Sequence, residues 1–229
     1  MTLITVGEFE IEVIRKKIKN LHLYVLHPMG DLKVTAPFKM DNEVIKHFVL
    51  SKTEWIRKQK LKISSTVYKK PLEFVSGEKI SILGKDYILK IIPGLSKNKI
   101  ELSNEELFIF QSKSDKTDRI AQTIKDFYRT VLKDIVSALI EKWESSLGVK
   151  ATFWNVKDMK TRWGTCNVQQ KRIWLSLKLA TKDLRHIEYV VVHELAHLIE
   201  RNHSKKFYAI LSNHIPDWKL LRRELNESR

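Results

Sequence analysis

Apolar and polar residues alternate along the first third of the chain, in the pattern that half-buried β-strands show. The alternation covers residues 9–13, 21–25 and 32–36, and short polar turns separate these segments. The pattern predicts three strands arranged as an antiparallel meander. Asp41 then stands where an N-cap belongs, ahead of apolar residues at helical spacing, and predicts a helix over residues 42–61.

Four shorter apolar segments follow, and each has the length of a strand. They cover residues 79–83, 86–92, 100–102 and 107–110. The next stretch, residues 111–116, contains no apolar side chain, which is typical of a boundary between packed parts. We therefore expect a β-rich subdomain over residues 1–115 and a second subdomain over residues 116–229, packed together as one compact unit.

Helical spacing dominates the second half of the chain. Apolar side chains between Ile120 and Leu147 recur every three or four residues, and Gly148 stands where a left-handed C-cap would end that helix. Strands are expected at residues 151–157 and 172–177, with a loop at residues 162–166 before the second. Further helices are expected at residues 182–201, at residues 204–213 and after Pro216, with Asp217 as the last cap. Strands that mainly precede helices indicate an α+β fold.

The composition limits the class of protein. A chain of 229 residues can bury a core without disulfides, and its lone cysteine, Cys166, favours a reducing compartment. No apolar run approaches the ~18 residues of a membrane span. Glu8, Glu10 and Glu12 precede the first basic cluster, which is unlike a secretory signal. We expect a cytoplasmic protein with no membrane association.

The net charge of +15 makes nucleic acid a candidate partner. The charge is spread along the chain, with +6 over residues 1–115 and +9 over residues 116–229. A lysine-rich solubilising surface would give the same distribution. No nucleic-acid-binding motif accompanies the charge, and nothing in the sequence sets an oligomeric state.

The histidines are concentrated in one helical segment. Five of the eight lie within residues 186–214, and His193, Glu194 and His197 form an H-E-x-x-H motif. Residues four apart lie on one side of a helix, so His193 and His197 can reach the same ion. Catalytic zinc takes three protein ligands and one water. Glu194 lies about 100° round the helix, where a base for that water would be, whereas two histidines that only pack or cap are the alternative.

His203 is the best candidate for a third ligand. On a continuous helix it would lie about 240° from His197, so the helix has to end before His203. Asn202 tolerates the left-handed conformation and predicts a turn there, and Ser204 can cap the next helix. The alternatives are that His203 is an exposed loop residue or that Glu224 supplies the third ligand.

Other polar residues are candidates for supporting roles. Arg162, His186 and Tyr208 could line the cleft or stabilise an oxyanion, but a surface charge, a solvated helix start and simple packing are their respective alternatives. Glu200 lies one turn after His197 and could hydrogen-bond a ligand imidazole, or it could face solvent at a helix end.

Trp163 and Cys166 stand close together in the sequence. Trp163 is expected to pack beside the cleft or to form a substrate subsite. Cys166 has no second cysteine with which to build a thiolate metal site, which favours a buried thiol. Any metal in this chain would therefore be held by imidazoles.

Three segments resemble one protein family. Residues 193–207 (HELAHLIERNHSKKF) resemble the metal-binding segment of the YgjP-like metallopeptidases, which are relatives of the SprT-like and WLM families in the zincin superfamily. Residues 160–166 (KTRWGTC) resemble the second signature of that family, and residues 74–89 resemble its stretch around G-E-x-I-x-x-x-G. The resemblance extends over about residues 21–225. It implies a zincin-like fold, in which the active-site helix lies under a small sheet.

The resemblance also implies roles for single residues. His193, His197 and His203 would be the ligands of one catalytic Zn²⁺, and Glu194 would be catalytic. The metzincins share the spacing of the third histidine but carry glycine where this chain has Glu200.

The motif and the resemblance together predict a zinc metallopeptidase that acts on a protein or peptide. It would hydrolyse peptide bonds with a metal-activated water and with Glu194 as general base. One alternative is a nucleic-acid-associated protease that acts on DNA-bound proteins, as the SprT-like and WLM relatives suggest. Another is a metal-binding module without catalysis, although a structural site needs no base and more often has four ligands.

Overall fold

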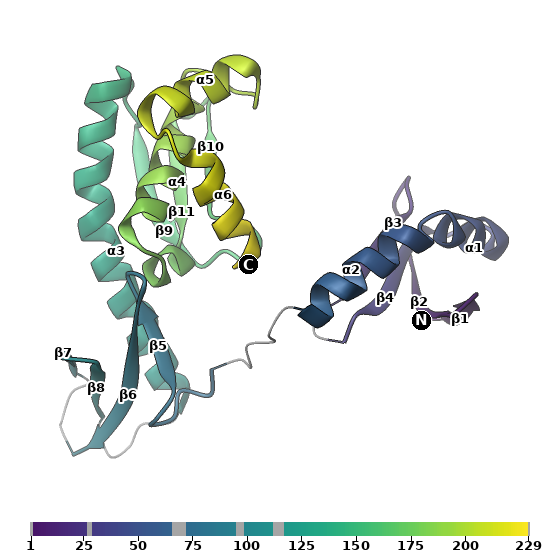
Figure 1. Cartoon of the computed structure of the whole chain (residues 1–229), viewed down its shortest axis with the longest axis horizontal. Coiled ribbons are helices and arrows are strands. Elements are labelled where there is room, and N and C mark those ends of the chain that lie inside the picture. Colours follow the sequence, from purple (N-terminus) through teal and green to yellow (C-terminus); the bar gives the residue numbers. More distant parts are fainter. Residues whose placement is uncertain (1, 27–28, 66–71, 95–98, 112–116, 229) are drawn as a thin grey trace. The chain divides into compact units, whose positions relative to one another are not determined.

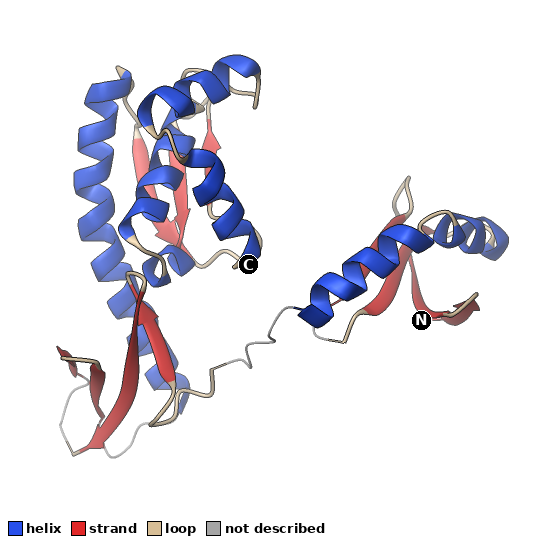
Figure 2. Ribbon diagram, in the orientation of Figure 1, coloured by secondary structure: helices blue, strands red, loops and turns tan. Residues whose placement is uncertain are grey.

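The computed structural model describes residues 2–26, 29–65, 72–94, 99–111 and 117–228 (Figure 1). The chain divides into two compact units, Met1–Pro71 and Leu72–Arg229. Each unit contains both helices and strands, as Figure 2 shows, and the predicted α+β class is confirmed. None of the helices in these described ranges is both long and apolar enough to cross a bilayer.

The first unit contains a four-stranded sheet in the order β1-β2-β4-β3. Its strands are β1 (Thr2–Val6), β2 (Phe9–Lys16), β3 (His22–Leu26) and β4 (Asp31–Pro37). The prediction of an antiparallel meander is wrong, because β2 and β4 are parallel neighbours and β3 lies at the edge. The burial of the strands gives the reason. Ile11 of β2 and Val34 of β4 are fully buried, whereas β3 has no fully buried side chain and suits an edge.

Two helices follow this sheet in the sequence: α1 (Asn42–Leu50) and α2 (Thr53–Ser65). Asp41 caps α1 as predicted. The single helix expected over residues 42–61 is interrupted, however, because two hydroxyls bond backbone carbonyls three residues earlier. Ser51 Oγ donates to Phe48 O at 2.7 Å, and Thr53 Oγ1 donates to Leu50 O at 2.8 Å. Such local bonds compete with regular helix.

The second unit begins with another four-stranded sheet, in the order β5-β6-β8-β7. All four predicted strands are present: β5 (Lys79–Ile82), β6 (Lys85–Pro93), β7 (Lys99–Ser103) and β8 (Glu106–Gln111). Ile80, Leu89 and Ile109 from this sheet share a core with Ile120 and Ile124, which belong to the following long helix.

This sheet packs with the C-terminal part of the chain. The backbone N–H of Leu83 donates to Ala180 O at 2.8 Å. Gly84 lies so close to Asp183 that a Cβ at Gly84 would come within 2.8 Å of the Asp183 Cβ. The division of the chain therefore falls between residues 71 and 72, whereas the polar stretch in the sequence predicts a boundary between residues 115 and 116. Most of the polar stretch expected at that boundary, residues 112–116, lies outside the described residues.

Helix α3 (Thr117–Leu147) has the predicted extent and ends at Gly148, whose φ is +65°. Leu132, Val136 and Ile140 on this helix are at most 4% exposed, whereas the apolar residue that directly precedes each of them is only half-buried. The helix contacts the elements at residues 153–157, 177–181 and 184–196, so its buried side is wider than a single helix neighbour would cover.

The remaining elements carry the histidine motif or surround it. They are β9 (Phe153–Lys157), β10 (Gly164–Asn167), β11 (Arg172–Ser176), the 3₁₀ helix η1 (Leu177–Thr181), α4 (Leu184–Ala196), α5 (Lys205–His214) and α6 (Trp218–Glu227). The strands form a sheet in the order β10-β11-β9, so β10 is an edge strand. Helix α4 contacts β10 and β11 on one side and α3, α5 and α6 on the others (Figure 1).

The loop predicted at residues 162–166 is wrong in part, because β10 begins at Gly164. The strand pairs antiparallel with β11, from Gly164↔Leu175 to Asn167↔Arg172. Its four residues include a glycine and two polar side chains, so apolar alternation could not mark it.

Candidate metal centre

Helix α4 holds the H-E-x-x-H motif on a rigid support. The Asp183 side chain caps the helix by accepting from Arg185 N at 3.0 Å. Ile187, Val191 and Leu195 are fully buried along its core side. These contacts fix where the motif residues project from the opposite side of the helix.

The chain turns immediately after the motif, as the third ligand requires. Regular helix ends at Ala196, and Ala196 O accepts from both Ile199 N and Glu200 N. Asn202 does not adopt a positive φ, so the predicted left-handed turn residue is wrong. Instead, the Glu200 carboxylate accepts from Asn202 N at 3.2 Å and shapes the turn.

Helix α5 then returns His203 towards α4. Ser204 caps α5 as predicted, accepting from Phe207 N at 3.3 Å. Phe207 is fully buried and its ring stacks on His197, with ring centroids 4.6 Å apart. This aromatic support was not predicted from the sequence. The available signal was that Phe207 is an apolar residue three positions after the predicted helix cap.

The structure brings the three predicted ligands together. One nitrogen from each of His193, His197 and His203 lies within 4.8 Å of the others. The Nε2 atoms of His193 and His203 are 3.1 Å apart. Glu224, the alternative ligand, lies elsewhere, because its carboxylate contacts His186.

Hydrogen bonds and burial prepare these imidazoles for a metal ion. His197 Nδ1 lies 3.3 Å from Glu200 O, and because a carbonyl only accepts, Nδ1 carries the proton and Nε2 is left free for an ion. Glu200 therefore holds a ligand imidazole through its backbone carbonyl rather than through its carboxylate. Burial lowers the pKa of His193 to about 3 and also lowers the pKa values of His197 and His203. All three rings are neutral at neutral pH, which is the ligating form.

Glu194 is buried beside the triad, with 5% of its surface exposed. Burial raises the pKa of its carboxyl to about 8, against the smaller opposing effect of the positive charge of Arg162. A carboxyl with a pKa near neutrality is suited to accept and return a proton.

Gly164 of β10 makes room for Glu194. A Cβ at Gly164 would lie 2.5 Å from Glu194 Oε1 and 2.7 Å from Glu194 Cγ, which is closer than atoms can approach. This glycine belongs to the KTRWGTC segment, and its role was not predicted from the sequence. A glycine inside a strand often marks a close approach of another group, and that was the available signal.

A cleft of about 760 Å³ opens over the triad. Glu194 and the three histidines form one side of it, and all four residues of β10 line it as well. The edge strand therefore runs along the place where the motif residues project.

The family model of the YgjP-like metallopeptidase domain matches residues 19–228. The chain belongs to this family. The match confirms the resemblance over residues 21–225, and it makes the protein a metallopeptidase with a metal ion and protein or peptide substrates.

Two solved structures of metallopeptidase zymogens are similar to part of this YgjP-like chain. The Pyrococcus abyssi abylysin zymogen has 21% identity and a TM-score of 0.37, covering 39% of this chain and 90% of that chain. The Methanocaldococcus jannaschii jannalysin zymogen has 19% identity and a TM-score of 0.38, covering 41% of this chain and 95% of that chain. Comparison with curated proteins gives no match.

Of the three candidates for supporting roles in this YgjP-like site, Arg162 lines the cleft. Tyr208 is not among the cleft-lining residues, but its ring stacks on His203 with centroids 6.1 Å apart, and its hydroxyl accepts from Arg222 at 3.2 Å. Arg222 was not predicted from the sequence.

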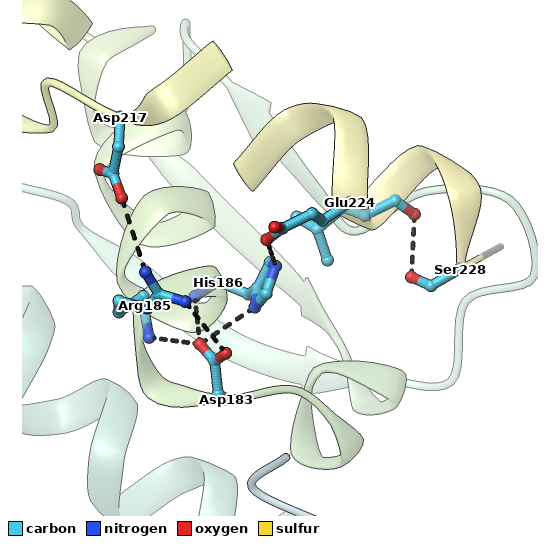
Figure 3. Close-up of polar contacts among 7 residues, drawn as sticks. Asp183, Arg185, His186, Asp217, Glu224 and Ser228 are labelled. Atoms are coloured by element: carbon cyan, nitrogen blue, oxygen red, sulfur yellow. Dashed lines mark hydrogen bonds and ion pairs between the residues drawn. The ribbon is translucent and has the colours of Figure 1, made fainter. Parts of the chain in front are cut away.

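His186, a candidate for lining the cleft, does not line it. Figure 3 shows its imidazole between two carboxylates, with Nε2 2.9 Å from Glu224 Oε2 and Nδ1 3.0 Å from Asp183 Oδ1. The reason is that α6 contacts α4 and brings Glu224 to the first turn of α4. His186 therefore links two helices at a distance from the proposed ligands.

Trp163 packs as expected, with 8% of its surface exposed and the Lys182 ammonium 5.6 Å from its ring. Cys166 is half-buried and lines the cleft. Burial, with a contribution from the charge of Glu194, raises the pKa of the thiol to about 11, so Cys166 stays protonated at neutral pH.

Proposed function

We propose that this chain is a zinc metallopeptidase in which His193, His197 and His203 hold one catalytic zinc ion and Glu194 is the general base. One observation carries the proposal. A buried carboxyl with a pKa raised to about 8 stands beside three neutral imidazoles whose ligand atoms converge. Among metal sites, three imidazoles and an adjacent base favour the catalytic zinc class.

The spacing of the nitrogens supports zinc. Two nitrogens bound to one tetrahedral zinc at 2.0–2.1 Å are about 3.4 Å apart, and the Nε2 atoms of His193 and His203 are 3.1 Å apart. Only three side chains converge among the described residues, which leaves a fourth position for a water or a substrate oxygen.

The residues of the chain divide the work of peptide hydrolysis. When bound, zinc supplies a Lewis acid that polarises a carbonyl and makes a water more acidic. Glu194 accepts a proton from the attacking water and returns it to the leaving amine. Arg162, which lines the cleft, would donate to the negative oxygen that develops. The edge strand β10 offers unpaired backbone groups to an extended peptide.

A metal-binding module without catalysis is a poorer explanation of the same residues. Burying Glu194 is unfavourable for its charged form, and Gly164 is required to accommodate it. A structural metal site gains nothing from either feature.

Peptide hydrolysis with and without metal tests the proposal. The zinc-loaded protein should cleave quenched fluorescent peptides, lose that activity on chelation and dialysis, and regain it when zinc is added in stoichiometric amount. Hydrolysis that persists after zinc content has fallen to zero would contradict the assignment.

A further inference from the structure

A second, smaller recess of about 250 Å³ adjoins the proposed catalytic residues. It shares four lining residues with the main cleft: Arg162, Gly164, His193 and Glu194. The two hollows therefore meet beside Glu194, the proposed general base. Helix α6 forms its far side through Arg222 and neighbouring residues. A volume of this size accommodates one side chain or one chain end rather than an extended segment.

The recess is rich in hydrogen-bond donors. Arg162 and Arg222 contribute guanidinium groups, Trp163 contributes an indole and Asn226 an amide. Neither arginine takes part in an ion pair within the described parts of the chain. Arg222 donates one hydrogen bond, to the Tyr208 hydroxyl, which leaves most of its five N–H donors available.

Trp163 adds an independent observation. Its side chain is buried, with 8% of the residue exposed, and its Nε1 has no hydrogen-bond partner among the described residues. Buried donors are nearly always satisfied, because an unsatisfied one costs free energy. Trp163 lines the recess, and the described residues supply no partner for this donor.

Charge selects the kind of acceptor. The two arginines face only one acidic side chain in the recess, Glu194, which is the proposed base. Tyr189 and Leu225 supply apolar walls. A carboxylate on a short apolar stem matches this combination, because guanidinium groups bind carboxylates through paired hydrogen bonds.

We propose that this recess is a substrate subsite that binds a carboxylate next to the scissile bond, with Arg222 as its principal recognition residue. The carboxylate comes from an acidic side chain or from the C-terminus of the peptide. The inference rests on the proposed function, because the position of the recess has meaning only if bonds are cleaved at Glu194.

Matched peptides separate the two sources of the carboxylate. The first set tests an acidic side chain: its peptides differ only in having Glu, Gln or Lys at one position flanking the cleaved bond. The second set tests the C-terminus: its peptides differ only in ending in a free carboxylate or in an amide. We expect at least about tenfold higher kcat/KM for one carboxylate-bearing form over its neutral counterpart. Equal kcat/KM across all pairs would overturn the inference.

Variants assign the preference to Arg222. Arg222→Gln should abolish the preference while still cleaving the neutral peptide, Arg222→Lys should retain part of it, and Arg222→Glu should favour the lysine peptide. Arg223→Gln is the matched control, because Arg223 is exposed on the same helix and does not line the recess. A preference that survives in Arg222→Gln, or that is lost equally in Arg223→Gln, contradicts the assignment.

Binding measurements keep this inference distinguishable from the proposed function. Fluorescence anisotropy of the same peptides, labelled and added to the zinc-loaded protein, reports recognition without turnover. Selective binding of the carboxylate form that is lost in Arg222→Gln, without cleavage of any peptide, would support the subsite and contradict the peptidase. Cleavage of all the peptides at equal rates and with equal affinities would support the peptidase and contradict the subsite.

Discussion

Replacing Gly164 with alanine tests the contact on which the placement of Glu194 depends. The added Cβ would lie 2.5 Å from Glu194 Oε1, 2.7 Å from Cγ and 2.8 Å from Cδ. Gly164 does not adopt a positive φ, so the substitution introduces no backbone strain of that kind. Contact distances near 3.5 Å are ordinary, so the carboxylate or the strand has to move by about 1 Å.

The magnitude follows from this displacement. Forcing extra atoms into a packed site costs about 1–3 kcal/mol of folding free energy. Displacing a catalytic group by about 1 Å costs about 10²-fold in rate. We therefore expect Gly164→Ala to lower kcat about 100-fold, with the zinc content unchanged because the three atoms nearest the added Cβ all belong to Glu194.

A double-mutant cycle isolates the steric contact from other effects of the substitution. Gly164→Ala is measured in the native background and in the Glu194→Ala background, by urea unfolding with a chelator present. Five of the six tryptophans lie in the second unit, so their fluorescence reports its unfolding. The destabilisation should be about 1–3 kcal/mol in the first background and near zero in the second. Equal destabilisation in both backgrounds would refute the reasoning.

Three further predictions follow from the site and its helices. His203→Ala should lose stoichiometric zinc in metal analysis, whereas His214→Ala should retain it; full zinc in His203→Ala would exclude that ligand. In the metal-free protein the pKa of Glu194 is raised from 4.5 to about 8, so the folded state binds the proton more tightly than the unfolded state does. The free energy of unfolding should therefore fall as the pH rises from about 6.5 to 8. Glu194→Gln should reduce that slope in urea unfolding, and an unchanged slope would count against the raised pKa. Asp183→Ala should lower the unfolding free energy by about 1 kcal/mol and Asp217→Ala by less, since only Asp183 makes a side-chain cap bond; the reverse order would contradict this.

Local signals in the sequence predicted the parts of the site that depend on helix geometry. Residues four apart share a side of a helix wherever the helix lies, so His193 and His197 could be paired without a structure. The need for a turn before His203 also followed from helix geometry. The residue that makes the turn did not, because Glu200 acts through a side-chain bond to Asn202 N. Asn202 itself was a plausible left-handed residue, and propensity alone could not exclude it.

Contacts between distant segments could not be predicted in the same way. The parallel pairing of β2 with β4 joins two segments that β3 separates in the sequence, and alternation does not specify a neighbour. His186 has the correct spacing to share the side of His193, but α6 supplies Glu224 and holds the imidazole there. Gly164 is needed only because Glu194, from another element, occupies the space next to it.

The most direct test of the proposed mechanism is paired measurement of zinc content and peptide hydrolysis in Glu194→Gln. Glutamine has nearly the shape of glutamate but cannot accept the proton, so the variant should bind one equivalent of zinc and lose hydrolysis. Glu188→Gln is the matched control on α4, because Glu188 bonds Lys142 and Trp143 and does not line the cleft. It should retain both zinc and activity. Full hydrolysis by zinc-loaded Glu194→Gln would contradict the account.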